Sequence, residues 1–195
     1  MKLCKGVEHN RKVVQDTKEI TMSKRAFLVG INQFIRPSWK LRGCINDTAE
    51  IQALLTSYYG FADTDLRIIH DSDASAQGIR DGLSWLLRDY DNDGSDVRVF
   101  HFSSHGTQVD DQGTDEWERL DEVIVTYDHD WKQPFRDDEL KVFFDTIPEN
   151  VNFTFIADCC HSGTMQRAAA ELEFRPRYLY PDKDVQDRIE TLRQE

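Results

Sequence analysis

Short apolar runs alternate with segments of helical periodicity along this 195-residue chain, and that alternation limits the possible folds more than any other feature. Four runs have the length and the β-branched or aromatic content of buried strands, at residues 25–31, 65–70, 97–102 and 151–157. Strands that alternate with helices form mostly parallel sheets with right-handed crossovers. The sequence therefore predicts an α/β fold with helices on both faces of a mostly parallel sheet.

Four segments have the pattern of helices: residues 43–60, about 75–89, 137–147 and 183–194. The first places four apolar side chains on one face, which we expect to be buried: Ile51, Leu54, Leu55 and Tyr58. Gly60 is its expected C-cap. Residues 106–121 have no periodicity and many acids, which indicates a long surface loop, and residues 122–127 are a candidate short strand.

The charge and the cysteines limit the partners and the compartment. The formal net charge of −12 argues against nucleic acid or an anionic membrane as a partner and favours cations or basic peptides. The N-terminus lacks the apolar stretch of a signal peptide, and no run is long enough to span a membrane. None of the four cysteines has C-x-x-C spacing. These features predict reduced thiols and a cytoplasmic location.

Reactive side chains follow two of the predicted strands. His105 comes after the third strand, and Cys159 and Cys160 come after the fourth. In parallel sheets, chemistry gathers at the carboxyl ends of the strands, and an imidazole beside a thiol can take its proton and stabilise the thiolate. A single histidine or cysteine at a strand end is usually structural. Two such residues, each followed by a glycine-containing turn, favour a catalytic pair.

Three motifs resemble those of metacaspases: H-F-S-S-H-G-T (101–107), D-C-C-H-S-G-T (158–164) and L-R-G-C-I-N-D-T-A (41–49). Their order matches that family. The resemblance implies a caspase-like three-layer α/β/α sandwich and a cysteine endopeptidase. It implies that Cys160 is the nucleophile and His105 the general base, with the backbone N–H groups of Gly106 and Cys160 as oxyanion donors. Cys159 is then expected to be a packed thiol at the strand end.

The resemblance also implies cleavage after Arg or Lys, because metacaspases differ from caspases in this preference. A desolvated guanidinium or ammonium needs carboxylates around it. Asp158 and Asp47 match the acids of the family's first substrate pocket, and Cys44 and Ser103 match residues that line it. From the sequence alone, Asp47 is equally well explained as an acid that stabilises the N-terminus of a helix.

Calcium is a possible cofactor, because many metacaspases are activated by it. Asp121, Asp137 and Asp138 match three calcium ligands of the family, and hard oxygen ligands suit this ion. The fourth ligand of the family lies seven residues after the nucleophile, where this chain has the cation Arg167. Glu116, Glu118 or water are candidate substitutes. The alternative is that these acids form a solvated rim that attracts basic substrates.

We expect three segments: an N-terminal extension (1–24), a catalytic large-subunit domain (25–165) and a C-terminal tail or linker (166–195), with the family's small subunit absent. The fourth strand would then be an exposed edge, which predicts a small-subunit partner or self-association. Basic residues of the tail are candidate self-cleavage sites: Arg167, Arg175, Arg177 and Lys183. The competing functions are a non-proteolytic caspase-like scaffold and a caspase that cleaves after Asp.

Overall fold

The computed structural model describes residues 23–91, 95–110, 120–159 and 177–192. Most of the predicted N-terminal extension lies outside these residues. Cys160, the predicted nucleophile, also lies outside them. The same is true of Arg167 and of Glu116 and Glu118, the candidate replacements for the fourth calcium ligand.

The core of the fold is a four-stranded sheet in which all neighbouring strands are parallel, as the sequence predicts. The strands lie in the order β2 (Leu66–His70), β1 (Lys24–Gly30), β3 (Val97–Ser103) and β7 (Asn152–Asp158). The register pairs Gly30 with Ser103 and Ser103 with Asp158, so three strands end at the same level. Among the described residues, β7 pairs only with β3 and forms an edge of this sheet.

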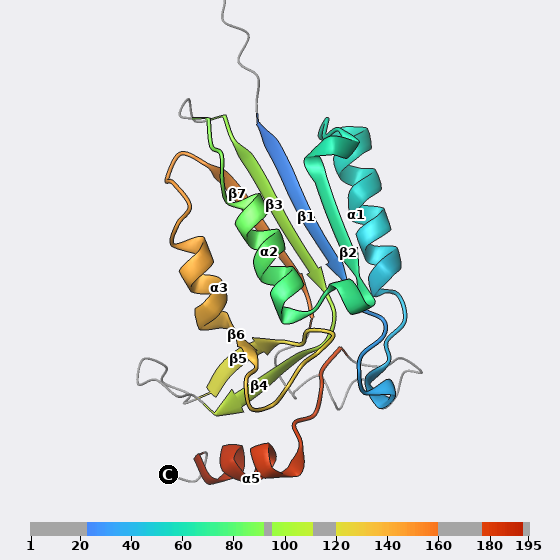
Figure 1. Cartoon of the computed structure of the whole chain (residues 1–195), viewed down its shortest axis with the longest axis vertical. Coiled ribbons are helices and arrows are strands. Elements are labelled where there is room, and N and C mark those ends of the chain that lie inside the picture. Colours follow the sequence, from blue (N-terminus) through green and yellow to red (C-terminus); the bar gives the residue numbers. More distant parts are fainter. Residues whose placement is uncertain (1–22, 92–94, 111–119, 160–176, 193–195) are drawn as a thin grey trace, which may run out of the picture.

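Helices cover both faces of the sheet and make a three-layer α/β/α sandwich (Figure 1). Because side chains alternate along a strand, Phe27 and Val29 of β1 pack in one cluster with α2 (Ala76–Leu86) and α3 (Asp137–Phe144). Ala26 and Leu28 pack in another cluster with Leu55 of α1 (Cys44–Tyr58). The predicted mixed α/β architecture is therefore confirmed.

The buried face of α1 differs from the one expected. Cys44, Thr48 and Leu55 are buried, whereas Leu54 and Tyr58 are 42% and 81% exposed. The threonine can lie in the buried stripe because its hydroxyl donates to the carbonyl of Ile45 and contacts the His70 ring nitrogen at 2.8 Å. Gly60 follows the helix with a φ of 65°, a left-handed conformation that glycine adopts without strain.

The expectation of a loop over residues 106–121 is wrong at both ends. Gly106–Asp110 is a strand, β4, which pairs antiparallel with β5 (Leu120–Ile124), and β5 pairs with the two-residue strand β6 (Phe135–Arg136). In β4, Thr107 and Val109 are buried, whereas Gln108 and Asp110 are half-buried. Because Thr107 is polar, this alternation does not appear as an apolar pattern in the sequence. This small sheet lies beyond the carboxyl ends of the parallel strands (Figure 1).

The predicted C-terminal helix is present as α5 (Lys183–Leu192), which packs beside β4 and β5 (Figure 1). Its Val185 and Ile189 are buried against apolar side chains of the small sheet: Val109, Leu120 and Val123. An ion pair of 3.1 Å between Arg188 and Asp110 adds to this contact. The end of the described chain is therefore docked onto the small sheet.

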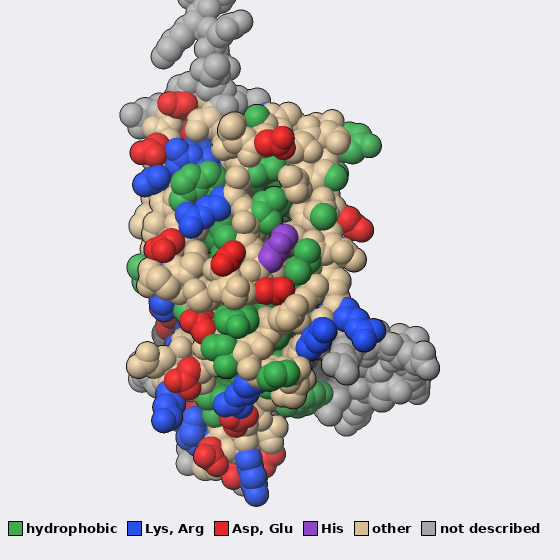
Figure 2. All heavy atoms as spheres, turned by 45° about the vertical axis from the view of Figure 1, so that its right-hand side comes forward, with side chains coloured by type: hydrophobic (Ala, Val, Ile, Leu, Met, Phe, Trp, Pro, Cys, Tyr) green, Lys and Arg blue, Asp and Glu red, His purple; other side chains and the backbone are tan. Residues whose placement is uncertain are grey.

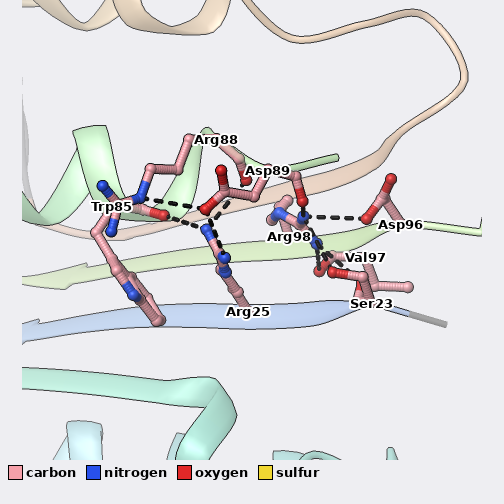
Figure 3. A network of polar contacts seen from close by, with 8 residues as sticks. All are labelled: Ser23, Arg25, Trp85, Arg88, Asp89, Asp96, Val97 and Arg98. Atoms are coloured by element: carbon pink, nitrogen blue, oxygen red, sulfur yellow. Dashed lines mark hydrogen bonds and ion pairs between the residues drawn. The ribbon is translucent and has the colours of Figure 1, made fainter. Parts of the chain in front are cut away.

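A polar network ties the starts of β1 and β3 to the end of α2 (Figure 3). Arg98 is fully buried, forms an ion pair of 3.0 Å with Asp96 and donates to the carbonyl of Ser23 at 2.8 Å. Arg25 donates to the carbonyl of Trp85 and pairs with Asp89. Arg98 and Asp96 are both buried, so removal of either would leave the charge of the other uncompensated. This pair lies at the end of the sheet opposite the candidate site.

The surface mixes charges of both signs. On the face shown in Figure 2, Lys and Arg side chains occur in small groups among Asp and Glu, with apolar side chains between them. No described helix combines the length and apolar character that a bilayer crossing needs.

Candidate active site

The two strand ends that carry the predicted catalytic pair are neighbours. β3 and β7 are adjacent and parallel, and Ser103 pairs with Asp158 at their carboxyl ends. His105 follows β3 by two residues, and Cys159 follows β7 directly. Cys159 packs partly buried against the core, as expected for a thiol at a strand end. Cys160 lies outside the described residues, but Cys159, directly before it, follows the end of β7, which is adjacent to the end of β3.

His105 is buried and held in one orientation. Its Nε2 lies 2.7 Å from the carbonyl oxygen of Trp39, which can only accept, so this nitrogen carries the proton. Its Nδ1 is buried and makes no hydrogen bond of normal geometry to a described residue, although the Arg177 backbone is close enough to influence the ring. Burial lowers the pKa of His105, although the carbonyl groups of Trp39 and Arg177 oppose the shift. The ring is therefore neutral near pH 7, with Nδ1 able to accept a proton.

The predicted pocket residues lie together at the ends of β1, β3 and β7. Asp47 comes from the first turn of α1, and its carboxylate accepts a hydrogen bond of 2.9 Å from the hydroxyl of Ser103. Cys44 is fully buried at the start of α1, and burial raises the pKa of its thiol. A Cβ on Gly30 would lie 2.6 Å from the carbonyl oxygen of Cys44, so only glycine lets α1 approach the end of β1 this closely.

A guanidinium from the chain itself occupies this pocket. Arg177 forms ion pairs with the carboxylates of both Asp47 and Asp158. It also donates to the hydroxyl of Ser103 at 2.8 Å and to the carbonyl of Asp158 at 3.1 Å. Burial would lower the pKa of Arg177, but the surrounding Cys44, Asp47 and Asp158 raise it. The two acids thus act together on one cation, with the hydroxyl of Ser103 as a third partner.

The backbone of Arg177 lies beside the predicted oxyanion donor. The N–H of Gly106 donates to the carbonyl oxygen of Arg177 at 2.8 Å. This is where a donor must lie to stabilise charge that develops on that oxygen. The side chain and the carbonyl of a single arginine therefore meet the pocket acids and the Gly106 N–H at once, next to the buried His105.

The amino-acid sequence is similar to those of known proteins. A family model described as the metacaspase, peptidase C14 domain matches residues 24–168. The chain belongs to the metacaspase family. Metacaspase-7 of Arabidopsis thaliana is 34% identical over 156 residues, which cover 77% of this chain and 37% of that protein. Metacaspase-1 of Schizosaccharomyces pombe is 33% identical over 147 residues, covering 72% and 34%.

A solved structure supports the fold. The crystal structure of protein GSU0716 from Geobacter sulfurreducens aligns with a TM-score of 0.63 and 23% identity, over 88% of this chain and 62% of that one. The metacaspase domain described here spans little more than a third of the length of the curated relatives named above. The resemblance seen in the three motifs is thereby confirmed at the level of the family.

The predicted calcium ligands of this metacaspase do not form a ready metal site among the described residues. There, no group of three or more His, Cys, Asp or Glu side chains could hold an ion. The carboxylate of Asp121 pairs with Arg136, the residue directly before α3. Asp137 begins α3, and burial raises its pKa, with Asp138 and Glu122 contributing in the same direction. The acids lie near one another, but an arginine engages one of them.

Sequence reasoning missed the residue that supports His105. Trp39 acts through its backbone carbonyl, which no side-chain pattern reveals. Its ring makes edge contacts with His129 and Trp131, whose centroids lie 5.8 and 6.1 Å away. Sequence reasoning also gave Arg177 only as a candidate cleavage site and did not place it in the pocket. Arg177, Asp47 and Asp158 can all be read in the sequence, but the ion pairs between them depend on the three-dimensional fold.

His129 makes the stability of this metacaspase domain depend on pH. It is 8% exposed, and burial lowers its pKa to about 4, below the usual value of about 6.5. A folded-state pKa below the unfolded value means that stability is lost as the pH falls from about 6.5 toward 4. His129→Phe should remove about 2 kcal/mol of the loss in unfolding free energy between pH 7.5 and 5, measured by urea denaturation. Equal losses in both proteins would contradict this.

Proposed function

We propose that this chain is a cysteine endopeptidase that cleaves peptide bonds after Arg or Lys, with Cys160 as nucleophile and His105 as general base. The seating of Arg177 between Asp47 and Asp158 carries the preference for a basic residue. A substrate aspartate would meet like charges in the same place, which disfavours a caspase that cleaves after Asp. Membership of the metacaspase family supports the peptidase chemistry.

The proposed reaction uses the groups at the ends of β3 and β7. Nδ1 of His105 takes the proton of the Cys160 thiol, and the thiolate attacks the carbonyl carbon of the basic residue. The N–H of Gly106, together with that of Cys160, stabilises the oxyanion. The carbon–nitrogen bond then breaks as the imidazolium gives its proton to the leaving nitrogen. Water hydrolyses the thioester, which restores the thiol and releases the acid.

Fluorogenic peptides that differ only in the residue before the reporter group test this proposal. We expect hydrolysis after Arg and Lys but not after Leu or Asp, lost in Cys160→Ala and retained in the matched Cys159→Ala variant. Because Arg177 competes for the pocket, Arg177→Ala is assayed in parallel. Hydrolysis after Asp would support a caspase instead. Silence of the chain and of Arg177→Ala with every peptide would support the non-proteolytic scaffold.

We also propose calcium activation, which rests on the acids Asp121, Asp137 and Asp138 and on the family resemblance. Arg136 would have to release Asp121 before an ion could bind there. The test is hydrolysis of the arginine peptide with and without millimolar calcium, in the chain and in Asp138→Asn. Stimulation that weakens in the variant supports the proposal. Equal rates with and without calcium would overturn it.

Self-processing belongs to the same proposal. Of the described basic residues in the tail, Arg177 pairs with both Asp47 and Asp158, whereas Lys183 begins α5. We therefore propose the bond between Arg177 and Tyr178 as the self-cleavage site. No described strand pairs with the outer edge of β7, and we therefore also propose a partner there, either a small subunit or a second copy. The cytoplasmic location remains a prediction from the sequence.

A further inference from the structure

The residues after Arg177 run parallel to the start of β4 and form hydrogen bonds with it. The N–H of Leu179 donates to the carbonyl of Gly106 at 2.9 Å, and Tyr178 forms an isolated parallel bridge with Gly106. The buried hydroxyl of Thr107 donates to the carbonyl of Leu179 at 2.7 Å. With the bond from the Gly106 N–H to the Arg177 carbonyl, the backbone is held on both sides of Tyr178: at the carbonyl of Arg177 before it, and at the N–H and carbonyl of Leu179 after it. An extended peptide is thus bound through its backbone.

The side chains of this segment are also received by the fold. Leu179 is 6% exposed and belongs to the main apolar cluster. Tyr178 and Tyr180 contact each other edge to face, with ring centroids 5.1 Å apart. Both line a cavity of about 410 Å³ whose other walls include Trp39 and His105. The second residue after the arginine therefore has an apolar environment beside the proposed general base.

Contacts farther along the tail hold this segment in place. Asp182 pairs with Arg36 at 2.9 Å, and the guanidinium of Arg36 lies 4.7 Å from the centroid of the Trp39 ring. Beyond it, Val185 and Ile189 of α5 are buried against β4 and β5. We use the term C-terminal arm for residues 178–192. The arm therefore has contacts of its own in addition to those of Arg177.

We propose that the edge of β4 at Gly106 and Thr107 is the binding site for the substrate residues that follow the cleaved bond, with a preference for an apolar second residue. The C-terminal arm of the chain occupies this site in the resting state. The inference rests on the proposed function, because the position of Arg177 defines where the cleaved bond lies. It extends that function from one pocket to the other side of the bond.

The same contacts determine what self-cleavage would do. Cleavage would leave a carboxyl on Arg177 and an amine on Tyr178, and the arm would still be held through Leu179 and α5. Cutting the bond would therefore not empty the site after it. Release of the arm, rather than cleavage alone, should open the site to other peptides.

Binding measured on the Cys160→Ala background tests this without any need for catalysis. The probe is a fluorescent peptide with the sequence of residues 177–181, R-Y-L-Y-P. In the full chain the arm should compete with it. Ile189→Asp, which places a charge in the buried face of α5, should raise the probe's affinity about tenfold or more. The matched Thr191→Asp variant adds the same charge to an exposed position of that helix and should not change it.

Two further measurements make the outcome decisive. With Ile189→Asp, the probe R-Y-D-Y-P should bind about tenfold more weakly than R-Y-L-Y-P, because its second residue meets an apolar environment. Leu179→Asp should raise probe affinity as Ile189→Asp does, without touching α5. Equal probe binding with and without these substitutions, or equal binding of the two probes, would overturn the inference. Absence of peptide hydrolysis by the Cys160 enzyme would count against the proposed function alone.

Discussion

Asp158→Ala is expected to lower kcat/KM for arginine peptides about a hundredfold or more, and Asp47→Ala should act similarly. A guanidinium that enters the pocket is desolvated, and truncation of one partner of such a pair costs about 2–5 kcal/mol. In the structure, one guanidinium, that of Arg177, pairs with both carboxylates, and Ser103 donates to Asp47. A substrate guanidinium bound in the same way would lose one of its two carboxylate partners in either variant. The measurement is kcat/KM for the arginine peptide in each variant.

Matched variants separate charge from packing. Asp158→Asn and Asp47→Asn keep the shape but not the charge, and should lose nearly as much activity as the alanine variants. Asp145→Ala removes an exposed acid that pairs with Lys141, away from the pocket, and should leave kcat/KM unchanged. Retention of full activity on arginine peptides in the Asp158 and Asp47 variants would remove both residues from the substrate pocket.

His105→Ala should lower kcat about a thousandfold with little change in KM, the usual size for loss of a general base. His105→Gln offers a sharper comparison, because its amide can still donate to the carbonyl of Trp39 but cannot take a proton from a thiol. Both variants should lose the same activity. Alkylation of Cys160 by iodoacetamide should also slow, since the thiolate would lose its proton acceptor.

A proton acceptor at His105 also has a pH signature. Burial lowers its pKa, so the neutral base persists below the usual value of about 6.5. The acid limb of kcat/KM for the arginine peptide should therefore lie below that pH. If His105→Gln kept most of the wild-type kcat, the ring would be a structural group held by Trp39.

The sequence predicted the sheet well because its strands are short runs rich in apolar residues, and the two central strands, β1 and β3, are buried along most of their length. Runs such as A-F-L-V-G have no exposed face, so they indicate central parallel strands, and the four predicted strands are all found. The ends of β3 and β7 then meet as the parallel-sheet rule requires. The pocket residues Asp47, Ser103 and Asp158 follow from the motifs together with this topology.

The rest depended on contacts that have no local signal. β4 was mistaken for a loop because Gly106–Asp110 is polar, and its burial comes from pairing with β5 and packing of α5. Thr48 lies in the buried stripe of α1 because His70, distant in sequence, meets its hydroxyl. Arg177 was visible as a basic residue, but its place between two acids depends on how the arm docks. Backbone groups, such as the Trp39 carbonyl, leave no trace in side-chain patterns.

Covalent labelling tests the central claim most directly. A peptidyl arginyl chloromethyl ketone should alkylate the Arg177→Ala chain, in which the pocket is open, once, as the Cys160 thiolate displaces chloride, and peptide mapping should locate the adduct. The account predicts labelling of Cys160 and not of the adjacent Cys159, strongly reduced in Asp158→Ala and not reproduced by the aspartyl analogue. Labelling of Cys159, or equal labelling by the arginyl and aspartyl reagents, would contradict an arginine-directed thiol peptidase.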